Sequence, residues 1–132
     1  MVEDAHERTG VVARAERRVS LDLRFPSALA PGEAFTVRVI VEDVGEADVR
    51  APLLHEAVFT NVTFEADGSL APLSMSIPAS AEIDKAMTPA IRVHVARGQT
   101  GTLERGDFIN PAIVPLPDAM EARCSIALVE VR

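Results

Sequence analysis

The densest group of carboxylates in the sequence lies in one short segment and consists of Glu42, Asp43, Glu46 and Asp48. Carboxylates at such spacing on a loop are typical ligands of Ca²⁺, which takes about six to eight oxygen atoms. The segment lacks the central glycine of an EF-hand loop, so further ligands would have to come from another loop. A solvated loop in which an aspartate caps a turn is the preferred interpretation. No metal or other cofactor is therefore predicted, with a calcium site at these four residues as the alternative.

Histidines offer a second kind of chemistry. His55 with Glu56, and separately His94, supply the groups that a metal pair or a general base requires. His55 enters a predicted strand, His94 points outward from another, and nothing in the sequence brings them together. Surface histidines are the preferred interpretation, so no catalytic residue is predicted. The least favoured of three possible functions is a hydrolytic enzyme built on His94, Asp107 and a loop carboxylate.

The single cysteine, Cys124, shares a strand face with Ile126 and Leu128, which indicates a buried thiol that acts as a small apolar side chain. One cysteine cannot form an internal disulfide, so the chain needs no oxidising compartment. The sequence has no Gly-x-Ser-x-Gly elbow, and the glycines between residues 98 and 106 precede neither a Walker lysine nor a predicted helix. Neither a serine hydrolase nor a nucleotide site is predicted.

The elements that must position these groups are short strands. After a Pro31-Gly32 turn, apolar residues alternate with polar ones from Phe35 to Val41, which predicts a central strand with one buried face. Ile40 on the opposite face indicates that this face is also partly covered. Val19 to Phe25 alternates in the same way. Further strands are predicted, in whole or in part, over residues 11–18, 53–65, 73–77, 90–97, 102–104, 108–110 and 124–131.

Two details of these strands carry specific expectations. In the run 53–65, Val58, Val62 and Phe64 share one parity, which predicts a common face. Near the end of the chain, Val129 and Val131 leave the parity of Ile126 and Leu128, which predicts a β-bulge or burial on both faces.

The predicted fold class is all-β: a single antiparallel β-sandwich of seven to eight short strands, immunoglobulin-like or transthyretin-like. An open barrel is the alternative. Residues 79–88 are expected to form a helical turn or an irregular connection. Residues 1–10 are polar and without periodicity, so they are expected to be a flexible tail, and residues 11–132 form the sandwich domain.

Composition narrows the function. The chain of 132 residues has a net charge of −7 and contains five Phe but no Trp or Tyr, which argues against binding nucleic acid. Twelve of the thirteen basic residues are arginine and only Lys85 is lysine, which we attribute to a GC-rich bacterial genome. The first twenty residues hold no apolar run, so no membrane insertion is predicted. The chain is expected to be cytoplasmic as written, or periplasmic if an export signal has been trimmed.

The segment from Asn110 to Pro117 is apolar and rich in proline. Such a segment either covers a sheet edge or presents a docking strip to a partner, and edge protection is the preferred interpretation. If it is a docking strip, the candidate partner-binding residues are Asn110, Pro111, Ile113, Pro115 and Leu116.

Several features between Val19 and Pro117 occur together in a known order. They are the Pro31-Gly32 turn, the strand exit Glu42-Asp43-Val44, the strand end Ile77-Pro78, the strand Ile91 to Ala96, and the segment Gly106-x-Phe108-Ile109-Asn110 with prolines after it. In this order the chain resembles the YbaY/YscW-type family, small bacterial lipoproteins related to a type III secretion pilot protein. The lipobox cysteine of that family is missing, so its membrane anchor does not carry over. The resemblance implies a non-enzymatic protein and supplies no catalytic residues.

Three functions follow, in order of preference. The first is a non-catalytic binding or assembly module that engages a protein partner, or a second copy of itself, through a sheet edge or loop end. The second is a carrier of a small apolar ligand, held between the two sheets. The hydrolytic enzyme is the third. The residues expected to line the ligand pocket are Phe59, Phe64, Met75 and Met87.

Overall fold

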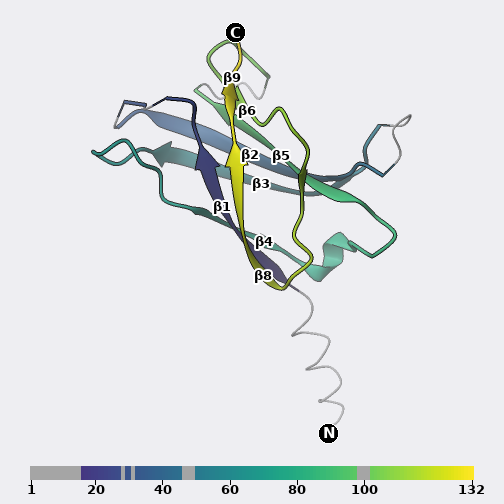
Figure 1. Ribbon diagram of the computed structural model, residues 1–132. Helices are drawn as coiled ribbons and strands as arrows, with labels where there is room; N and C mark the ends of the chain where they lie inside the picture. Colours follow the sequence, from purple (N-terminus) through teal and green to yellow (C-terminus); the bar gives the residue numbers. More distant parts are fainter. Residues whose placement is uncertain (1–15, 28, 31, 46–49, 98–101) are drawn as a thin grey trace, which may run out of the picture.

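The computed structural model describes residues 16–27, 29–30, 32–45, 50–97 and 102–132. The predicted tail, Pro31, Glu46 and Asp48 lie outside these residues. The described chain forms two β-sheets that pack face to face, so the predicted all-β sandwich is confirmed (Figure 1). The small sheet has the order β4-β1-β8, and the larger sheet has the order β3-β2-β5-β6-β9, with β7 also paired to β5.

The nine strands of the described chain differ widely in length, and three have only two residues. The small sheet contains β1 (Arg17–Arg24), β4 (Leu73–Ile77) and β8 (Glu121–Ala127). The larger sheet contains β2 (Ala34–Asp43), β3 (Leu53–Thr63), β5 (Pro89–Ala96), β6 (Phe108–Ile109), β7 (Val114–Pro115) and β9 (Val129–Glu130). A single turn of 3₁₀ helix, η1 (Ala79–Ala81), follows β4, within the segment expected to be a helical turn or irregular.

Strand β2 has the central place that its alternation predicts. Val37, Val39 and Val41 are fully buried, whereas the residues between them are only half-buried. Hydrogen bonds tie β2 to β3 on one side and to β5 on the other. Burial of each such valine contributes about 1.5 kcal/mol or more, so this row anchors the larger sheet.

One end of the sandwich is closed by aromatic rings. Phe25 lies edge-on to Phe64 and to Phe108, with ring centroids 5.0 and 5.1 Å apart. Phe35 meets Phe64 in the same geometry at 5.6 Å. The Arg97 guanidinium lies 5.4 Å from the Phe35 ring centroid, in the range of a cation–π contact. This end is therefore packed with side chains drawn from both sheets.

The prediction of a purely antiparallel sandwich is wrong for one pair of strands. Strands β1 and β8 run parallel, with Leu21 opposite Cys124 and Leu23 opposite Ile126. Figure 1 shows the two strands side by side, pointing the same way and crossing over the strands of the larger sheet. A parallel pair requires a crossover connection. Here the chain leaves β7, crosses to the small sheet near Pro117 and enters β8 beside the start of β1, where the Arg18 N–H donates to the Met120 carbonyl at 2.7 Å.

The parity switch near the end of the chain has a different cause from the predicted bulge. Strand β8 ends at Ala127 in the small sheet, and β9 begins at Val129 in the larger one. Between them, Leu128 is 4% exposed, and its N–H donates to the Arg24 carbonyl at 2.9 Å. The last segment thus changes sheets at Leu128, which reverses the face that its alternate residues present.

The predicted common face along residues 53–65 is interrupted. Phe35 pairs with Val62 but Val37 pairs with Phe59, so β3 has one extra residue at this point. Asn61 has φ 56°, a left-handed conformation that asparagine tolerates better than most residues. Because of this bulge Phe59 and Val62 are half-buried while Val58 is 48% exposed.

Residues 102–104 form no strand, contrary to the expectation. The chain instead turns tightly after Glu104: the Asp107 N–H donates to the Glu104 carbonyl at 3.1 Å, and Gly106 has φ 91°. The strand Phe108–Ile109 follows directly. Across the described residues, no helix is long and apolar enough to cross a membrane.

Candidate functional site

Two open pockets contain the titratable side chains of interest. The first, here called the outer-face pocket, is a hollow of about 310 Å³ on the outer face of the larger sheet. The strand register assembles it, because Arg38 on β2 lies opposite His94 on β5 and Ile40 lies opposite Arg92. Its lining consists of Arg38, Ile40, Arg92, Val93, His94, Leu103, Ile109 and Asn110.

His94 and Asp107 meet beside the outer-face pocket, with His94 Nε2 and Asp107 Oδ2 2.7 Å apart. Asp107 is 3% exposed, and its Oδ2 also accepts the Glu104 N–H at 3.0 Å. Burial by itself would raise the pKa of the Asp107 carboxyl, but hydrogen bonds from His94 and from the Glu104 and Arg97 backbones outweigh it and lower that pKa. Asp107 is thus an ionised group that fixes the turn after Glu104, and His94 fixes that turn to β5.

Both arginines of the outer-face pocket are already paired. Arg92 donates to both oxygens of Glu42, at 3.0 and 3.2 Å, and Arg38 lies 3.2 Å from Glu56. These are the bidentate and single contacts that neighbouring strands provide when opposite charges face each other. The charge of this pocket is therefore balanced within the protein.

Asn110 completes the edge of β5. Its side-chain oxygen accepts the Val93 N–H at 2.7 Å, and its amide donates to the carbonyls of Ile91 and Ala112 at 3.0 and 3.2 Å. The side chain thereby occupies the gap in the ladder between β6 and β7, where the backbone bends away. Within the proline segment, Asn110 is therefore the residue whose side chain covers the edge of β5.

The remaining candidates for a docking strip separate into two groups. Pro111, Pro115 and Ile113 are exposed, Ile113 to 73%. Leu116 is 6% exposed, and its N–H donates to the Pro89 carbonyl at 3.0 Å. Only the exposed residues could contact a partner across the strip, whereas Leu116 faces the second pocket.

Glu42 and Asp43 are engaged in the fold. Glu42 binds Arg92, and Asp43 Oδ1 accepts the N–H groups of Gly45 and Thr88, each at 3.0 Å. Within the described part of the chain, no three acidic, histidine or cysteine side chains are placed to share a metal ion. Glu46 and Asp48 lie outside the described residues. His55 on β3 faces Val41 rather than a residue of the outer-face pocket.

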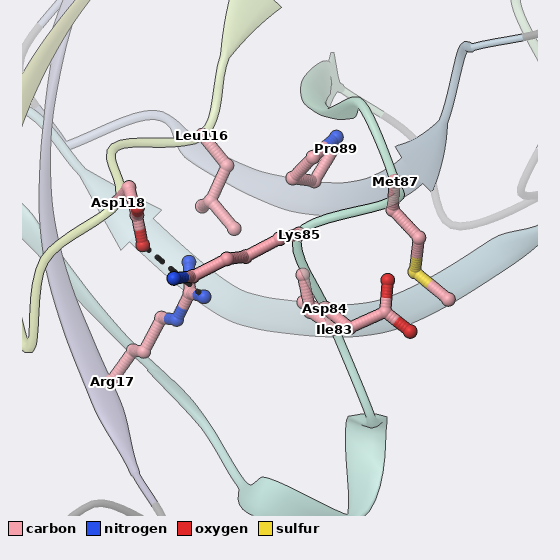
Figure 2. A pocket seen from close by; sticks show the side chains of 8 residues that line it. All are labelled: Arg17, Ile83, Asp84, Lys85, Met87, Pro89, Leu116 and Asp118. Carbon is pink, nitrogen blue, oxygen red and sulfur yellow. Dashed lines mark ion pairs between the residues drawn. The ribbon is translucent and has the colours of Figure 1, made fainter.

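The second pocket, here called the end pocket, lies at the start of β1 and holds about 430 Å³ (Figure 2). The aromatic rings lie at the other end of that strand, because Phe25 follows its last residue. The wall of the end pocket is the loop after η1, which starts from Glu82 in a left-handed conformation, φ 56°. The Asp84 carboxylate shapes that loop by accepting the Ala86 N–H at 2.9 Å. The lining consists of Arg17, Ile83, Asp84, Lys85, Met87, Pro89, Leu116 and Asp118.

The end pocket combines apolar walls with a charged mouth. Ile83, Met87 and Leu116 face the hollow from the loop after η1 and from the segment after β7. At the mouth, Arg17 Nη1 donates to the Pro117 carbonyl at 3.3 Å, and Arg17 Nη2 lies 3.7 Å from Asp118. In Figure 2 the Lys85 side chain extends toward Arg17 and Asp118.

The four residues expected to line a ligand pocket are not together in the end pocket. Met75 and Phe64 are 1% and 6% exposed and belong to the core, and Phe59 lies half-buried on β3. Met87 alone of the four lines the end pocket. Sequence analysis did not predict Arg17 and Lys85 as site residues, because they come from distant segments of the chain. The one available signal was that Lys85 is the single lysine among the basic residues, and this was attributed to the composition of the genome.

The comparisons with known proteins concern the fold. No family model and no curated protein matches the chain. Among solved structures, the chain is similar to one described as an alternative pilotin from the type II secretion system of Vibrio cholerae. The sequences are 21% identical, the TM-score is 0.59, and the match covers 89% of this chain and 96% of that one. The likeness supports a pilotin-like fold, whereas the narrower YbaY/YscW-type assignment stays a prediction.

Proposed function

We propose that this protein is a non-catalytic binding module, an accessory of a secretion assembly, and that it holds a protein partner at the end pocket. The observation that carries the proposal is the end pocket itself: an open hollow with apolar walls inside a charged mouth. Interface anchors have this form, because a buried apolar side chain supplies affinity and a polar rim excludes water around it. The pilotin-like fold supports a protein as the occupant.

The outer-face pocket supports catalysis less well. His94 and Asp107 form a hydrogen-bonded pair, but the carboxylate already accepts from backbone groups and holds a turn. Among the described residues that line this pocket, there is no serine, cysteine or unpaired carboxylate to act as a nucleophile or second acid. The pair is therefore assigned a structural role.

A matched pair of methionine variants tests the end pocket. Met87→Lys places a charge on the apolar wall, while Met120→Lys makes the same change at a residue 43% exposed and outside the pocket lining. The tagged parent and both variants are incubated with bacterial envelope and soluble extracts, and retained proteins are identified by mass spectrometry. We expect a partner that the parent and Met120→Lys retain and that Met87→Lys loses by about tenfold or more.

Two results would contradict the proposal. If Met87→Lys retains the same proteins as the parent, the end pocket is not the binding site. If native mass spectrometry of the parent instead shows a bound small apolar molecule that Met87→Lys lacks, the protein is a ligand carrier that uses the same pocket.

A further inference from the structure

The mouth of the end pocket brings two cations together from distant parts of the chain. Arg17 begins β1, and Lys85 lies in the loop between η1 and β5. In Figure 2 both side chains point into the same side of the hollow. Two cations that line one pocket favour an anion that comes to lie between them.

The acidic residues nearby satisfy these two cations only in part. Asp118 forms an ion pair with Arg17 at 3.7 Å, but its side chain is 91% exposed, so the pair is weak and an incoming carboxylate can compete with it. The Asp84 carboxylate is bound to the Ala86 N–H, and in Figure 2 it points away from Lys85, toward Met87. Across the described residues, no carboxylate lies within ion-pair distance of Lys85.

The position of these cations matters because the protein as a whole is acidic, with a net charge of −7. The lining holds two cations and two carboxylates, so an acidic group is attracted only locally, by Lys85 and by the weakly paired Arg17, while the overall field repels a strongly acidic chain. Arg17 is also well placed for a directed contact, because its side chain is only 23% exposed and one nitrogen is already fixed by the Pro117 carbonyl. A guanidinium held in this way loses little freedom when it binds a carboxylate.

An apolar surface lies next to the cations. Leu116 and Pro89 form one side of the hollow and Ile83 and Met87 another. A ligand that fills the pocket therefore meets hydrocarbon and positive charge together.

We propose that the end pocket recognises a protein segment in which an acidic residue follows an apolar residue: the apolar side chain enters the hollow, and the carboxylate binds Arg17 and Lys85. This inference rests on the proposed protein-binding function and specifies the chemistry of the partner. It is carried by charge complementarity with the two cations.

Two small probes that differ only in charge test this inference. Acetyl-leucyl-glutamyl amide and acetyl-leucyl-glutaminyl amide are titrated into the ¹⁵N-labelled full chain, and backbone amide shifts are followed by NMR. We expect shifts centred on the loop after η1 and on Leu116, with about fivefold tighter binding of the glutamyl probe. The preference should weaken as sodium chloride is raised, because salt screens exposed charges.

A matched pair of cation variants completes the test. Lys85→Gln should abolish most of the preference for the glutamyl probe, whereas Arg105→Gln, the same change of charge in the turn before Gly106 and outside the pocket lining, should leave it unchanged. Equal binding of the two probes, or no shift at the pocket with either, overturns the inference. Partner capture that still depends on Met87 would in that case leave the proposed function standing, so the two failures are distinguishable.

Discussion

The outer-face pocket and the end pocket each contain two arginine or lysine side chains beside apolar surface. They differ in how closely those side chains are paired with carboxylates. In the outer-face pocket each arginine meets a glutamate at about hydrogen-bond distance, Arg92 with Glu42 and Arg38 with Glu56. In the end pocket Arg17 forms only a longer ion pair, at 3.7 Å, with the 91% exposed Asp118, and among the described residues no carboxylate lies within ion-pair distance of Lys85.

The difference comes from how each pocket is built. Regular pairing of adjacent strands sets the outer-face pocket, and such pairing places opposite charges side by side. The end pocket is assembled from the start of a strand and two loops, so strand pairing does not place its opposite charges next to each other. A pocket whose charges are satisfied internally serves the fold, whereas one with a weakly paired arginine, and a lysine that no described carboxylate pairs, is available to a ligand.

The largest expected loss of stability follows from mutation of Asp107, the buried carboxylate beside the outer-face pocket. Asp107→Ala should lower the free energy of unfolding by about 3 kcal/mol, because it leaves His94 and the Glu104 N–H without their acceptor. Urea unfolding at pH 7 measures this loss. Asp118→Ala, which removes a carboxylate 91% exposed, is the control and should change stability by less than about 0.5 kcal/mol.

The same carboxylate predicts a pH dependence. The pKa of Asp107 is lower in the folded chain than in the unfolded one, so its ionisation stabilises the fold. That stabilisation is complete above the ordinary aspartate pKa of about 3.9 and is lost as the pH falls through the lower folded value. The stability difference between the parent and Asp107→Asn should therefore shrink below about pH 4. A difference that stays constant from pH 6 to pH 3 (about the range in which carboxyls titrate) would contradict this account.

The second-largest effect is expected at the β5 edge. Asn110→Ala removes one acceptor and two donor contacts to backbone groups, and should cost about 2 kcal/mol of stability. Hydrogen exchange sharpens the test, because the Val93 amide should lose protection more than amides of β1. If the proline segment is held by its own packing instead, Asn110→Ala will leave the Val93 amide protected.

The ion pair across the outer-face pocket should matter much less. The Arg92 side chain is 60% exposed, so Arg92→Gln is expected to lower stability by only about 0.5 kcal/mol, and less at high salt. Thermal unfolding at low and high sodium chloride measures both. A loss above about 2 kcal/mol would show that the Arg92–Glu42 pair is coupled to the buried contact between His94 and Asp107.

The smallest effect on stability is expected at the end pocket. Lys85→Gln should leave the free energy of unfolding nearly unchanged, because it removes an exposed cation without breaking a described contact. Chemical denaturation of the parent and variant gives the comparison directly. A marked loss of stability would mean that Lys85 serves the fold, and the contrast between the two pockets would fail.

The regular strands could be predicted from the sequence because their signal is local. Val37, Val39 and Val41 alternate with polar residues, and Ile91, Val93 and Val95 do the same, so each strand and its buried face follow from period two. The role of the segment 110–117 was harder to predict from the sequence. Its prolines indicate a sheet edge, but they do not show that the Asn110 side chain takes the place of a backbone group in the hydrogen-bond ladder.

The missed features depend on contacts between distant segments. Asp107 follows a glycine and reads as a turn residue, yet it is buried because the turn folds back onto His94. The parallel pairing of β1 with β8 leaves no local pattern, and the switch at Leu128 looks the same as a bulge. Arg17 and Lys85 line one pocket only because the fold brings the start of β1 and the loop after η1 to the same place.

The pairing of β1 with β8 also bears on how the chain is made. Strand β1 is the middle strand of the small sheet, and its neighbour β8 comes much later in the chain: Ser125 lies 103 residues after its partner Asp22. On the ribosome, apolar residues such as Leu21 and Leu23 have to wait for Ile126 to emerge before that side of the sheet can close. The nascent chain therefore keeps this side of β1 open to chaperones until β8 has been made, and a chain cut before β8 should be unable to complete the small sheet.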